Sequence, residues 1–444
     1  MSQSEQQLLE TLTQQILDEA TRQGASAAEA GSRVEEGYTS TVRMGEVETI
    51  EHHKDRGMGV TVYFGEHKGT ASTSDFSSDA VVQAVRAACD IARYTQADEY
   101  AGLADPEQLA SEFPELELDH PWSVGVEESI DLAKRCEQSA LEYDPRVVNS
   151  DGGSVSSHRS IRVYGNSHGF LSGYGSSRHG ISCSVIAREP GSEDMQRNYW
   201  YSSVRDPEQL ETVSEIGEMA ARRTLDRLGS RKGKTGQAPV LFDATIAGGL
   251  LGHLVGAIRG GSLYRKASFL LDQLGQPLFP EWVSVYEEPH LKRAAASASF
   301  DSDGVATRQN NFVTEGVLSS YVLDCYSARR LGMETTGNGG GVRNLRMSHG
   351  ELELSGLLKK MGEGLLVTEL MGQGVNTLTG DYSRGAAGFW VEGGEIAYPV
   401  DEITIAGNLK EMFAGIVEVG ADTDLRGNIQ TGSILLEQMS IAGE

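Results

Sequence analysis

The first half of the chain repeats one order of elements, helix then strands then helix, and this order limits the possible folds more than any other feature. Apolar residues recur at helical spacing over 8–20. Residues 38–51 alternate around a glycine turn, which predicts a hairpin, and residues 58–64 predict a third strand. Helical spacing returns over 81–92. Residues 1–96 are therefore predicted to form one α+β unit.

A second unit with the same order is predicted after an acidic connection. Residues 97–120 are acidic and lack any period, which is typical of a solvated connection. A helix is expected over 126–143, followed over 147–188 by antiparallel strands between glycine turns. A long helix over 207–228 closes this second α+β unit, 121–228. The order is compatible with an internal duplication, although no repeat is visible residue by residue.

A glycine-rich polar stretch, Gly229–Gly236, separates these units from the rest of the chain. Its glycine spacing resembles a phosphate-binding loop, but its Lys-Thr pair precedes the last glycine, and a strand instead of a helix follows. We interpret it as a linker. Beyond it, residues 237–444 are mostly strands and turns around a small-residue helix over 244–258. The predicted fold class is α+β, with N-terminal units of helices and antiparallel strands before a β-rich C-terminal domain.

The charge balance of the chain excludes some partners. Lys and Arg number 38 against 64 Asp and Glu, which gives a formal net charge of −26. Such a protein repels a phosphate backbone and an acidic membrane surface, so neither nucleic acid nor membrane is an expected partner. The sequence has no signal-peptide pattern and no membrane-spanning apolar run, and its four cysteines are scattered, which is typical of reduced, mostly buried thiols. We therefore expect a cytoplasmic protein.

The segment Gly248–Lys266 is the best candidate for a zinc-binding helix, and it lacks ligands. Such a helix needs two ligands on one face and a carboxylate that activates water. Here His253 is the only histidine, and no acidic residue lies between Asp243 and Asp272. Each glycine in this helix costs about 1 kcal/mol relative to alanine, so close packing or a partner chain must compensate. The residues alone predict a packed histidine and no metal site.

Other polar residues are weaker candidates for a catalytic or metal-binding site. His52 and His53 are neighbours in a predicted strand, where successive side chains point to opposite faces, so they are not expected to share a ligand. His168 and His179 lie in glycine turns without a nearby acid. The pair 287–288 is interpreted as a solvated acidic turn. None of these predicts a catalytic site.

Seven short sequence blocks lie in order along the whole chain. They are Arg56-Gly-Met-Gly-Val, Gly69-Thr-Ala-Ser-Thr-Ser-Asp-Phe-Ser, Ser262-Leu-Tyr-Arg-Lys-Ala-Ser, Asp303-Gly-Val-Ala-Thr-Arg, Thr335-Thr-Gly-Asn-Gly, Asn376-Thr-Leu-Thr-Gly-Asp-Tyr-Ser and Tyr398-Pro-Val-Asp-Glu-Ile-Thr-Ile-Ala-Gly-Asn-Leu. Each block is weak alone, but the series is specific. It resembles the PmbA/TldE branch of the TldD–PmbA family of metallopeptidases, the modulator of gyrase proteins.

This resemblance implies that the zinc site is absent from this chain. In the TldD branch, zinc is held by a His-Glu-x-x-x-His segment and by a cysteine from the C-terminal region. When the chains are aligned on Arg265-Lys266, Gly252 matches the first His, His253 the Glu and Ala257 the second His. No cysteine follows Cys325. The resemblance thus implies no catalytic residue and no cofactor here, with zinc expected in a TldD-like partner.

The resemblance also implies an assembly. A TldE-like chain is expected to pair with a TldD-like zinc peptidase chain that acts on extended or unfolded peptides, in peptide-antibiotic maturation or antitoxin degradation. When isolated, it is expected to form a homodimer. Two alternatives stay open. One is a metalloprotease active on its own, using His253 with distant acids, and the other is a regulatory protein that contacts gyrase or an RNA-binding regulator.

Seven residues are candidates for a cleft facing substrate or partner: Arg265, Lys266, Asn338, Asn376, Thr379, Asp381 and Arg384. The segment 376–385 is a predicted loop between strands, a common position for binding residues. The favoured alternative is a polar turn held by its own Asn and Asp side chains. The glycines after Asn338 would admit a peptide backbone or form only a flexible loop, and Arg265 and Lys266 would face a substrate carboxylate or solvent.

Overall fold

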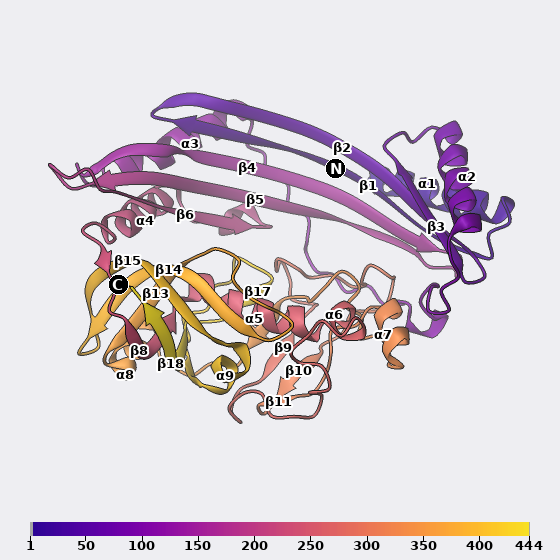
Figure 1. The fold of residues 1–444 in the computed structure, drawn as a ribbon. Helices are drawn as coiled ribbons and strands as arrows, with labels where there is room; N and C mark the ends of the chain where they lie inside the picture. Colours follow the sequence, from indigo (N-terminus) through magenta and orange to yellow (C-terminus); the bar gives the residue numbers. More distant parts are fainter. Residues whose placement is uncertain (1–2, 444) are drawn as a thin grey trace.

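Six strands from both N-terminal units form a single antiparallel sheet in the computed structural model, which describes residues 3–443 (Figure 1). The strands are β1 (Ala27–Arg43), β2 (Glu46–Phe64), β3 (His67–Thr73), β4 (Val147–Asn166), β5 (Leu171–Arg188) and β6 (Met195–Val204). Their order is β3-β2-β1-β4-β5-β6. The two predicted units therefore share one sheet, joined by the antiparallel pairing of β1 with β4.

The first hairpin is confirmed, whereas the predicted third strand is not a separate element. β1 and β2 meet at Met44 and Gly45, which both have positive φ, as a tight hairpin turn requires. Residues 58–64 continue β2, because the glycines at 57 and 59 stay within the ladder opposite β1 and make no turn. The separate third strand is β3, which follows the turn at Gly65.

Two pairs of helices cover one face of this sheet, one pair at each end (Figure 1). The pairs are α1 (Gln3–Arg22) with α2 (Ser78–Tyr94), and α3 (Val126–Leu141) with α4 (Val213–Leu225). Both pairs lie on the same face, because Ala30 and Val42 of β1, an even number of residues apart, pack into the first and second helix cores. α4 is shorter than the predicted span 207–228, because a capping box of Thr212 and Glu215 starts it later.

The contact between α3 and α4 depends on Gly217. A Cβ atom at this position would lie 2.3 Å from the carbonyl oxygen of Cys136 in α3. Overpacking of this kind costs about 1–3 kcal/mol. We expect Gly217→Ala to lower the free energy of unfolding by that amount, measured by chemical denaturation. In the control, Gly249→Ala in the helix after Asp243, the new Cβ meets nothing within 4 Å, so stability should rise. Equal losses in both variants would contradict the packing argument.

Residues 97–120 are more than the solvated connection that their acidity predicts. Leu116 and Leu118 are buried, and Leu109 forms a bridge with Val305 of the C-terminal domain. The apolar residues of the segment therefore pack inward while most of its acids face solvent. The segment attaches the sheet to the C-terminal domain as well as joining the two helix pairs.

The C-terminal domain is β-rich, as predicted, and contains two sheets. The larger sheet has the order β16-β18-β8-β13-β14-β15-β7, and a further pairing of β18 with β15 closes its central strands into a ring. Its strands are β7 (Arg231–Lys232), β8 (Gly236–Phe242), β13 (Gly364–Met371), β14 (Asp381–Glu392), β15 (Glu395–Asn408), β16 (Ile416–Val419) and β18 (Ile434–Ala442). The smaller sheet contains β11 (Val317–Leu318), β10 (Asn311–Thr314), β9 (Val285–Glu287), β12 (Leu345–Met347) and β17 (Ile429–Gln430).

Short helices complete this domain. They are α5 (Ala244–Ile258), α6 (Gly260–Tyr264), α7 (Cys325–Leu331), α8 (Leu354–Met361) and α9 (Leu409–Ala414); elsewhere the 3₁₀ turns are η1 (Pro106–Gln108) and η2 (Pro207–Gln209). The predicted linker Gly229–Gly236 is partly ordered, because it contains β7, which pairs with β15. The four cysteines are buried and free, as their scattered positions predict. Within the described residues, no helix combines the length and the apolar character needed to cross a bilayer.

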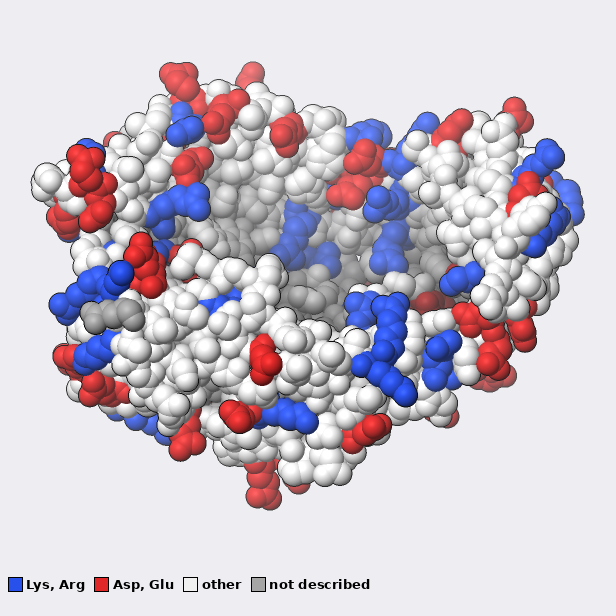
Figure 2. Space-filling model, viewed as in Figure 1, with Lys and Arg blue, Asp and Glu red and all other residues white. Residues whose placement is uncertain are grey.

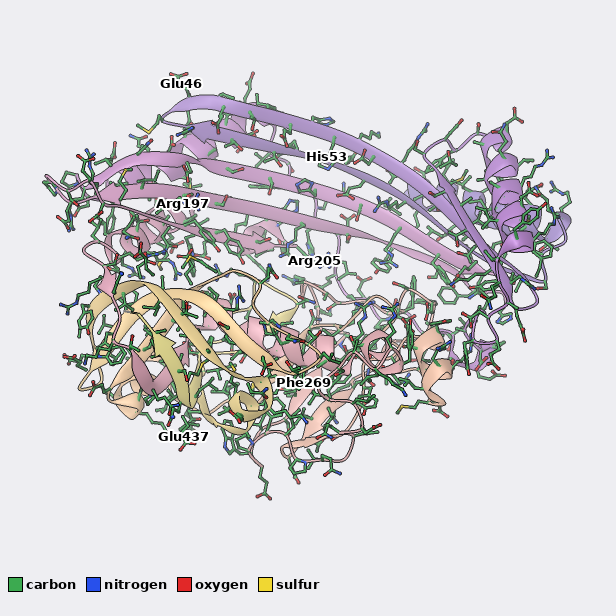
Figure 3. The ribbon with its side chains drawn as sticks, in the orientation of Figure 1. Glu46, His53, Arg197, Arg205, Phe269 and Glu437 are labelled. Atoms are coloured by element: carbon green, nitrogen blue, oxygen red, sulfur yellow. The ribbon has the colours of Figure 1, made fainter. Side chains whose placement is uncertain are left out.

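A hollow lies between the helix-free face of the sheet and the C-terminal domain, and Lys and Arg side chains gather on its walls (Figure 2). Part of it is a cavity of about 680 Å³ whose lining includes Arg33, Arg56 and Arg162 of the sheet. Arg205, just after β6, donates hydrogen bonds of 2.8 Å to two backbone carbonyls of the C-terminal domain, those of residues 294 and 295 (Figure 3). The hollow is therefore locally basic in a chain of net charge −26.

Candidate functional site

A cleft lies where β6, the last strand of the six-stranded sheet, meets the C-terminal domain. Its volume is about 370 Å³. Its lining includes residues 197–201 of β6, Arg223 of α4, Thr245 of α5, Glu369 of β13, Arg384 of β14, and Arg426; we call it the β6 cleft. β6 pairs with β5 on one side only, within the described residues. Alternate backbone N–H and C=O groups of an edge strand point outward, so β6 can accept a further extended chain, except at the carbonyl of Tyr201, which accepts from Arg426.

Arg426 is fixed between aromatic rings and a carboxylate in this cleft. Its guanidinium carbon lies 4.1 Å from the ring centroid of Trp200 and 4.4 Å from that of Tyr201. Its Nε and Nη2 donate to the two oxygens of Asp424 at 2.9 and 2.8 Å. Its Nη1 donates to the carbonyl oxygen of Tyr201 at 3.2 Å. A bidentate, stacked arginine is rigid, so this arrangement fixes one wall of the cleft.

Two other arginines in the cleft have buried donor atoms without a partner among the described residues. These atoms are Nε of Arg223 and Nε of Arg384. A buried donor left unpaired costs about 1–3 kcal/mol, which a bound acceptor would recover. Carbonyl and carboxylate oxygens of a peptide are suitable acceptors. Of the seven residues predicted from the sequence, Arg384 is the one that lines this cleft.

His253 lies on α5 and packs against Tyr382 of β14. The two rings meet edge to face with centroids 5.9 Å apart. Burial lowers the pKa of His253, and the nearby charge of Arg384 lowers it further, so the imidazole is neutral at pH 7. Burial raises the pKa of Tyr382 to about 12. His253 is thus a half-buried packed histidine, as a lone histidine on an apolar helix predicts.

The other positions matched to the zinc segment have unrelated surroundings. A Cβ atom at Gly252 would lie 3.8 Å from the side chain of Ile429, whereas Ala257 is fully buried in the core. Within residues 3–443, His253 belongs to no group of three His, Cys, Asp or Glu side chains close enough to share one ion. Gly252 therefore lies where α5 packs against β17, while Ala257 fills the core of the domain.

The polar residues of the predicted loop bond mainly to one another. The side-chain oxygen of Asn376 accepts from the N–H of Leu378 at 2.9 Å. Thr379 Oγ1 donates to Asp381 Oδ2 at 2.6 Å. The loop is also shorter than predicted, because β14 begins at Asp381. These are the hydrogen bonds that the polar-turn alternative predicts for Asn376, Thr379 and Asp381.

The candidates Arg265 and Lys266 follow α6 and are exposed. The N–H of Phe269 donates to the carbonyl oxygen of Thr377 at 2.9 Å, so this segment lies beside the polar loop (Figure 3). The guanidinium carbon of Arg265 lies 5.3 Å from the ring centroid of Tyr264. Arg265 and Lys266 are not among the described residues that line the β6 cleft.

The prediction that Asn338 faces a cleft is wrong. Its side chain is only 3% exposed, and its Nδ2 donates to both carboxylate oxygens of Glu287, at 2.9 and 3.1 Å. Glu287, predicted as part of a solvated turn, is 1% exposed in β9. It also accepts from Asn310 Nδ2 at 2.6 Å and from the N–H of Arg343 at 2.7 Å. These residues form a buried polar cluster that stabilises the C-terminal domain.

The sequence predictions missed the aromatic residues of the β6 cleft. Tyr199 is 59% exposed, which is unusual for a large aromatic side chain. The run Asn198-Tyr-Trp-Tyr201 was a usable signal, since consecutive aromatic residues in a strand place rings on both of its faces. Exposed aromatic residues of this kind are enriched at binding surfaces.

Three domain families match consecutive parts of the chain. They are PmbA/TldA metallopeptidase domain 1 over residues 28–92, the central domain over 119–228 and the C-terminal domain over 235–443. Metalloprotease PmbA of Escherichia coli O157:H7 is 50% identical over 441 residues, which cover 99% of this chain and 97% of that protein. The PmbA homologue of Haemophilus influenzae is 47% identical, covering 96% and 94% of the two chains.

Solved structures agree with this assignment. A proposed modulator of DNA gyrase from Bacteroides thetaiotaomicron superposes with a TM-score of 0.92 at 28% identity, over 98% of each chain. TldE from Thermococcus kodakarensis has the same fold, with a TM-score of 0.84 at 21% identity, over 97% of this chain and 100% of that one. The chain therefore belongs to the PmbA/TldD family of metallopeptidases, and to its PmbA/TldE branch.

Proposed function

We propose that this chain is the subunit of a heteromeric peptidase that lacks the catalytic zinc, which its TldD-like partner holds, and that its β6 cleft binds extended peptides. The observation that carries the proposal is the contrast between two neighbouring surfaces. On α5, His253 packs against an aromatic ring instead of joining other ligands. In the adjoining cleft, arginine donors and aromatic rings stand beside a strand edge in the described part of the chain.

The chemistry of the β6 cleft suits an unfolded peptide. The outward backbone groups of β6 would hydrogen-bond an extended chain, which selects segments without stable structure of their own. The unpaired Nε donors of Arg223 and Arg384 would take carbonyl or carboxylate oxygens. Tyr199 would pack against a side chain of the peptide. The zinc of the partner chain would supply the Lewis acid and the activated water.

The proposal places the assembly in the cytoplasm, in line with four free cysteines. It assigns this chain a homodimeric state when isolated, with the TldD-like chain as its working partner. The solved relatives described as modulators of DNA gyrase leave a regulatory contact with a protein as the competing function. The same experiment addresses both.

In that experiment, the full chain is mixed with its TldD-like counterpart, and complex formation and cleavage of an unstructured peptide are measured. We expect Tyr199→Ala to form the complex normally and to cleave about tenfold more slowly, because the lost aromatic contact is worth up to about 1.5 kcal/mol. The control is Tyr94→Ala, a tyrosine on α2 that is 91% exposed; it should cleave at the wild-type rate.

Two outcomes would overturn the proposal. Cleavage by the isolated chain, abolished by His253→Ala, would make it a metalloprotease in its own right. A failure of the two chains to associate would favour the regulatory function.

A further inference from the structure

Three side chains from adjacent strands converge on the face of the sheet that looks into the hollow. Glu35 belongs to β1, His53 to β2 and His158 to β4, and their ligand atoms all lie within 4.8 Å of one another. We propose that they form a binding site for a zinc-class divalent cation, on the sheet and separate from α5. His53 lies near the middle of β2, away from the strand ends (Figure 3).

The register of the sheet creates this convergence. Gly37 of β1 lies directly opposite His53 on one side and His158 on the other. Because Gly37 has no side chain, the two imidazoles lean toward each other over its backbone, with ring centroids 4.9 Å apart. A Cβ atom at Gly37 would lie 2.5 Å from Nδ1 of His158. The glycine therefore leaves open the space in which the two rings meet.

The distances suit one tetrahedral ion. Zinc bonds of about 2.0–2.1 Å at tetrahedral angles separate two ligand atoms by about 3.3 Å. Nε2 of His53 lies 3.2 Å from Nδ1 of His158 and 4.0 Å from Oε1 of Glu35. The third pair, Glu35 and His158, also lies within 4.8 Å, so the glutamate side chain would have to move toward the two rings to bind the same ion. Two imidazoles and one carboxylate are a ligand set preferred by zinc and its neighbours among the divalent transition metals.

Two acidic residues beside the site offset the basic character of the hollow. Glu51 and Asp55 flank His53 at alternate positions of β2, so they lie on the same face. Arg33 of β1 and Arg178 of β5 also face this side, but Arg178 is turned toward the carbonyl oxygen of Arg426 at 2.9 Å.

A bound ion would have two consequences. It would cross-link the neighbouring strands β1, β2 and β4. At His53 the strand β2 has no pairing with β3, which ends opposite Met58 of β2. The side chains of His53 and Glu35 are 34% and 39% exposed, so a fourth coordination position would remain open toward the hollow. In zinc sites such an open position takes water or a ligand atom of a bound molecule.

Zinc titration of the metal-free full chain tests the proposal, using a competing chromophoric chelator. We expect one zinc per wild-type chain, and an affinity at least tenfold lower in His53→Gln and in His158→Gln. His52→Gln is the matched control, because His52 neighbours His53 but points to the opposite face, and it should bind like the wild type. Cobalt in place of zinc should give a tetrahedral visible spectrum that His53→Gln abolishes.

Circular dichroism of each variant establishes that it is folded. Absence of zinc binding in the wild type would leave only a hydrogen bond between the two imidazoles and would overturn the proposal. Equal binding in the wild type and His53→Gln would overturn it too, since the ion would then lie elsewhere. Neither result affects the proposed peptide-binding role, which is measured by Tyr199→Ala in the two-chain complex.

Discussion

Glu287→Ala is expected to lower the free energy of unfolding by about 3 kcal/mol or more, because it leaves several buried donors without an acceptor. The carboxylate is 1% exposed and accepts from Asn310, Asn338 and the N–H of Arg343. Burial raises the pKa of Glu287, and these donors oppose that effect. Alanine removes the acceptor and leaves a cavity in its place. Chemical denaturation of the full chain, followed by circular dichroism, measures the loss.

The next residue along the chain provides the control. Glu288 is partly exposed and pairs with Arg346 at 2.9 Å, and ion pairs of this kind contribute about 0–1 kcal/mol. Glu288→Ala should therefore change stability by about 1 kcal/mol or less. If the two variants lose similar amounts, the buried cluster does not stabilise the domain as its hydrogen bonds imply.

The second large effect is the contribution of Asp301 to stability, which is lost between about pH 4 and about pH 7. Four histidines whose pKa burial lowers act in the opposite direction, so the effect of Asp301 is the difference between the wild type and an Asp301 variant. Asp301 is fully buried, and burial, followed by the charge of Asp303, raises its pKa from 3.8 to about 7. In this range the folded chain keeps the proton that the unfolded chain has lost, so the folded state binds more protons. The contribution of Asp301 to the free energy of unfolding is fully present below the pKa of the unfolded state. It is lost as the pH rises through the pKa of the folded state, by at most about 1.4 kcal/mol per pH unit.

Denaturation at several pH values between about 4 and about 8 tests this slope. Burial also raises the pKa values of Glu29 and Glu287, which makes stability fall further as the pH rises. The pKa values of Glu117 and Asp144 are lowered to about 2, so these residues change stability mainly below this pH range. Asp301→Asn should be less stable, because its amide cannot accept from all the backbone N–H groups that Asp301 binds. Its free energy of unfolding should also change less with pH. An unchanged slope in this variant would exclude Asp301 as the cause.

Much of the fold could be predicted because its helices are amphipathic and its turns are rich in glycine. The helices α1, α2 and α3 match their predicted spans closely, since local spacing of apolar residues determines them. The pairing of β1 with β4 could not be predicted, because it joins residues more than a hundred positions apart whose side chains carry no pairing signal. For the same reason, residues 58–64 were predicted as a separate strand, although they belong to β2.

The candidate site was harder to predict than the fold. The sequence predicted a packed histidine at His253, and the structure shows it packed against Tyr382. Arg384 lines the β6 cleft, while its role toward substrate or partner stays a prediction. The opposite wall of that cleft, residues 197–201, comes from another part of the chain and is invisible to local patterns. Glu287 was misjudged because charged residues are rarely buried, and only its hydrogen-bond partners, distant in sequence, explain the exception.

The continuous six-stranded sheet has a consequence for how the chain can be divided. β1 takes hydrogen bonds from β2 on one side and from β4 on the other, so a fragment ending at residue 96 would expose one whole edge of a 17-residue strand. Exposed edges of that length recruit other strands and promote aggregation. We therefore expect the two N-terminal sequence domains to fold as one unit, so that neither is stable without the other.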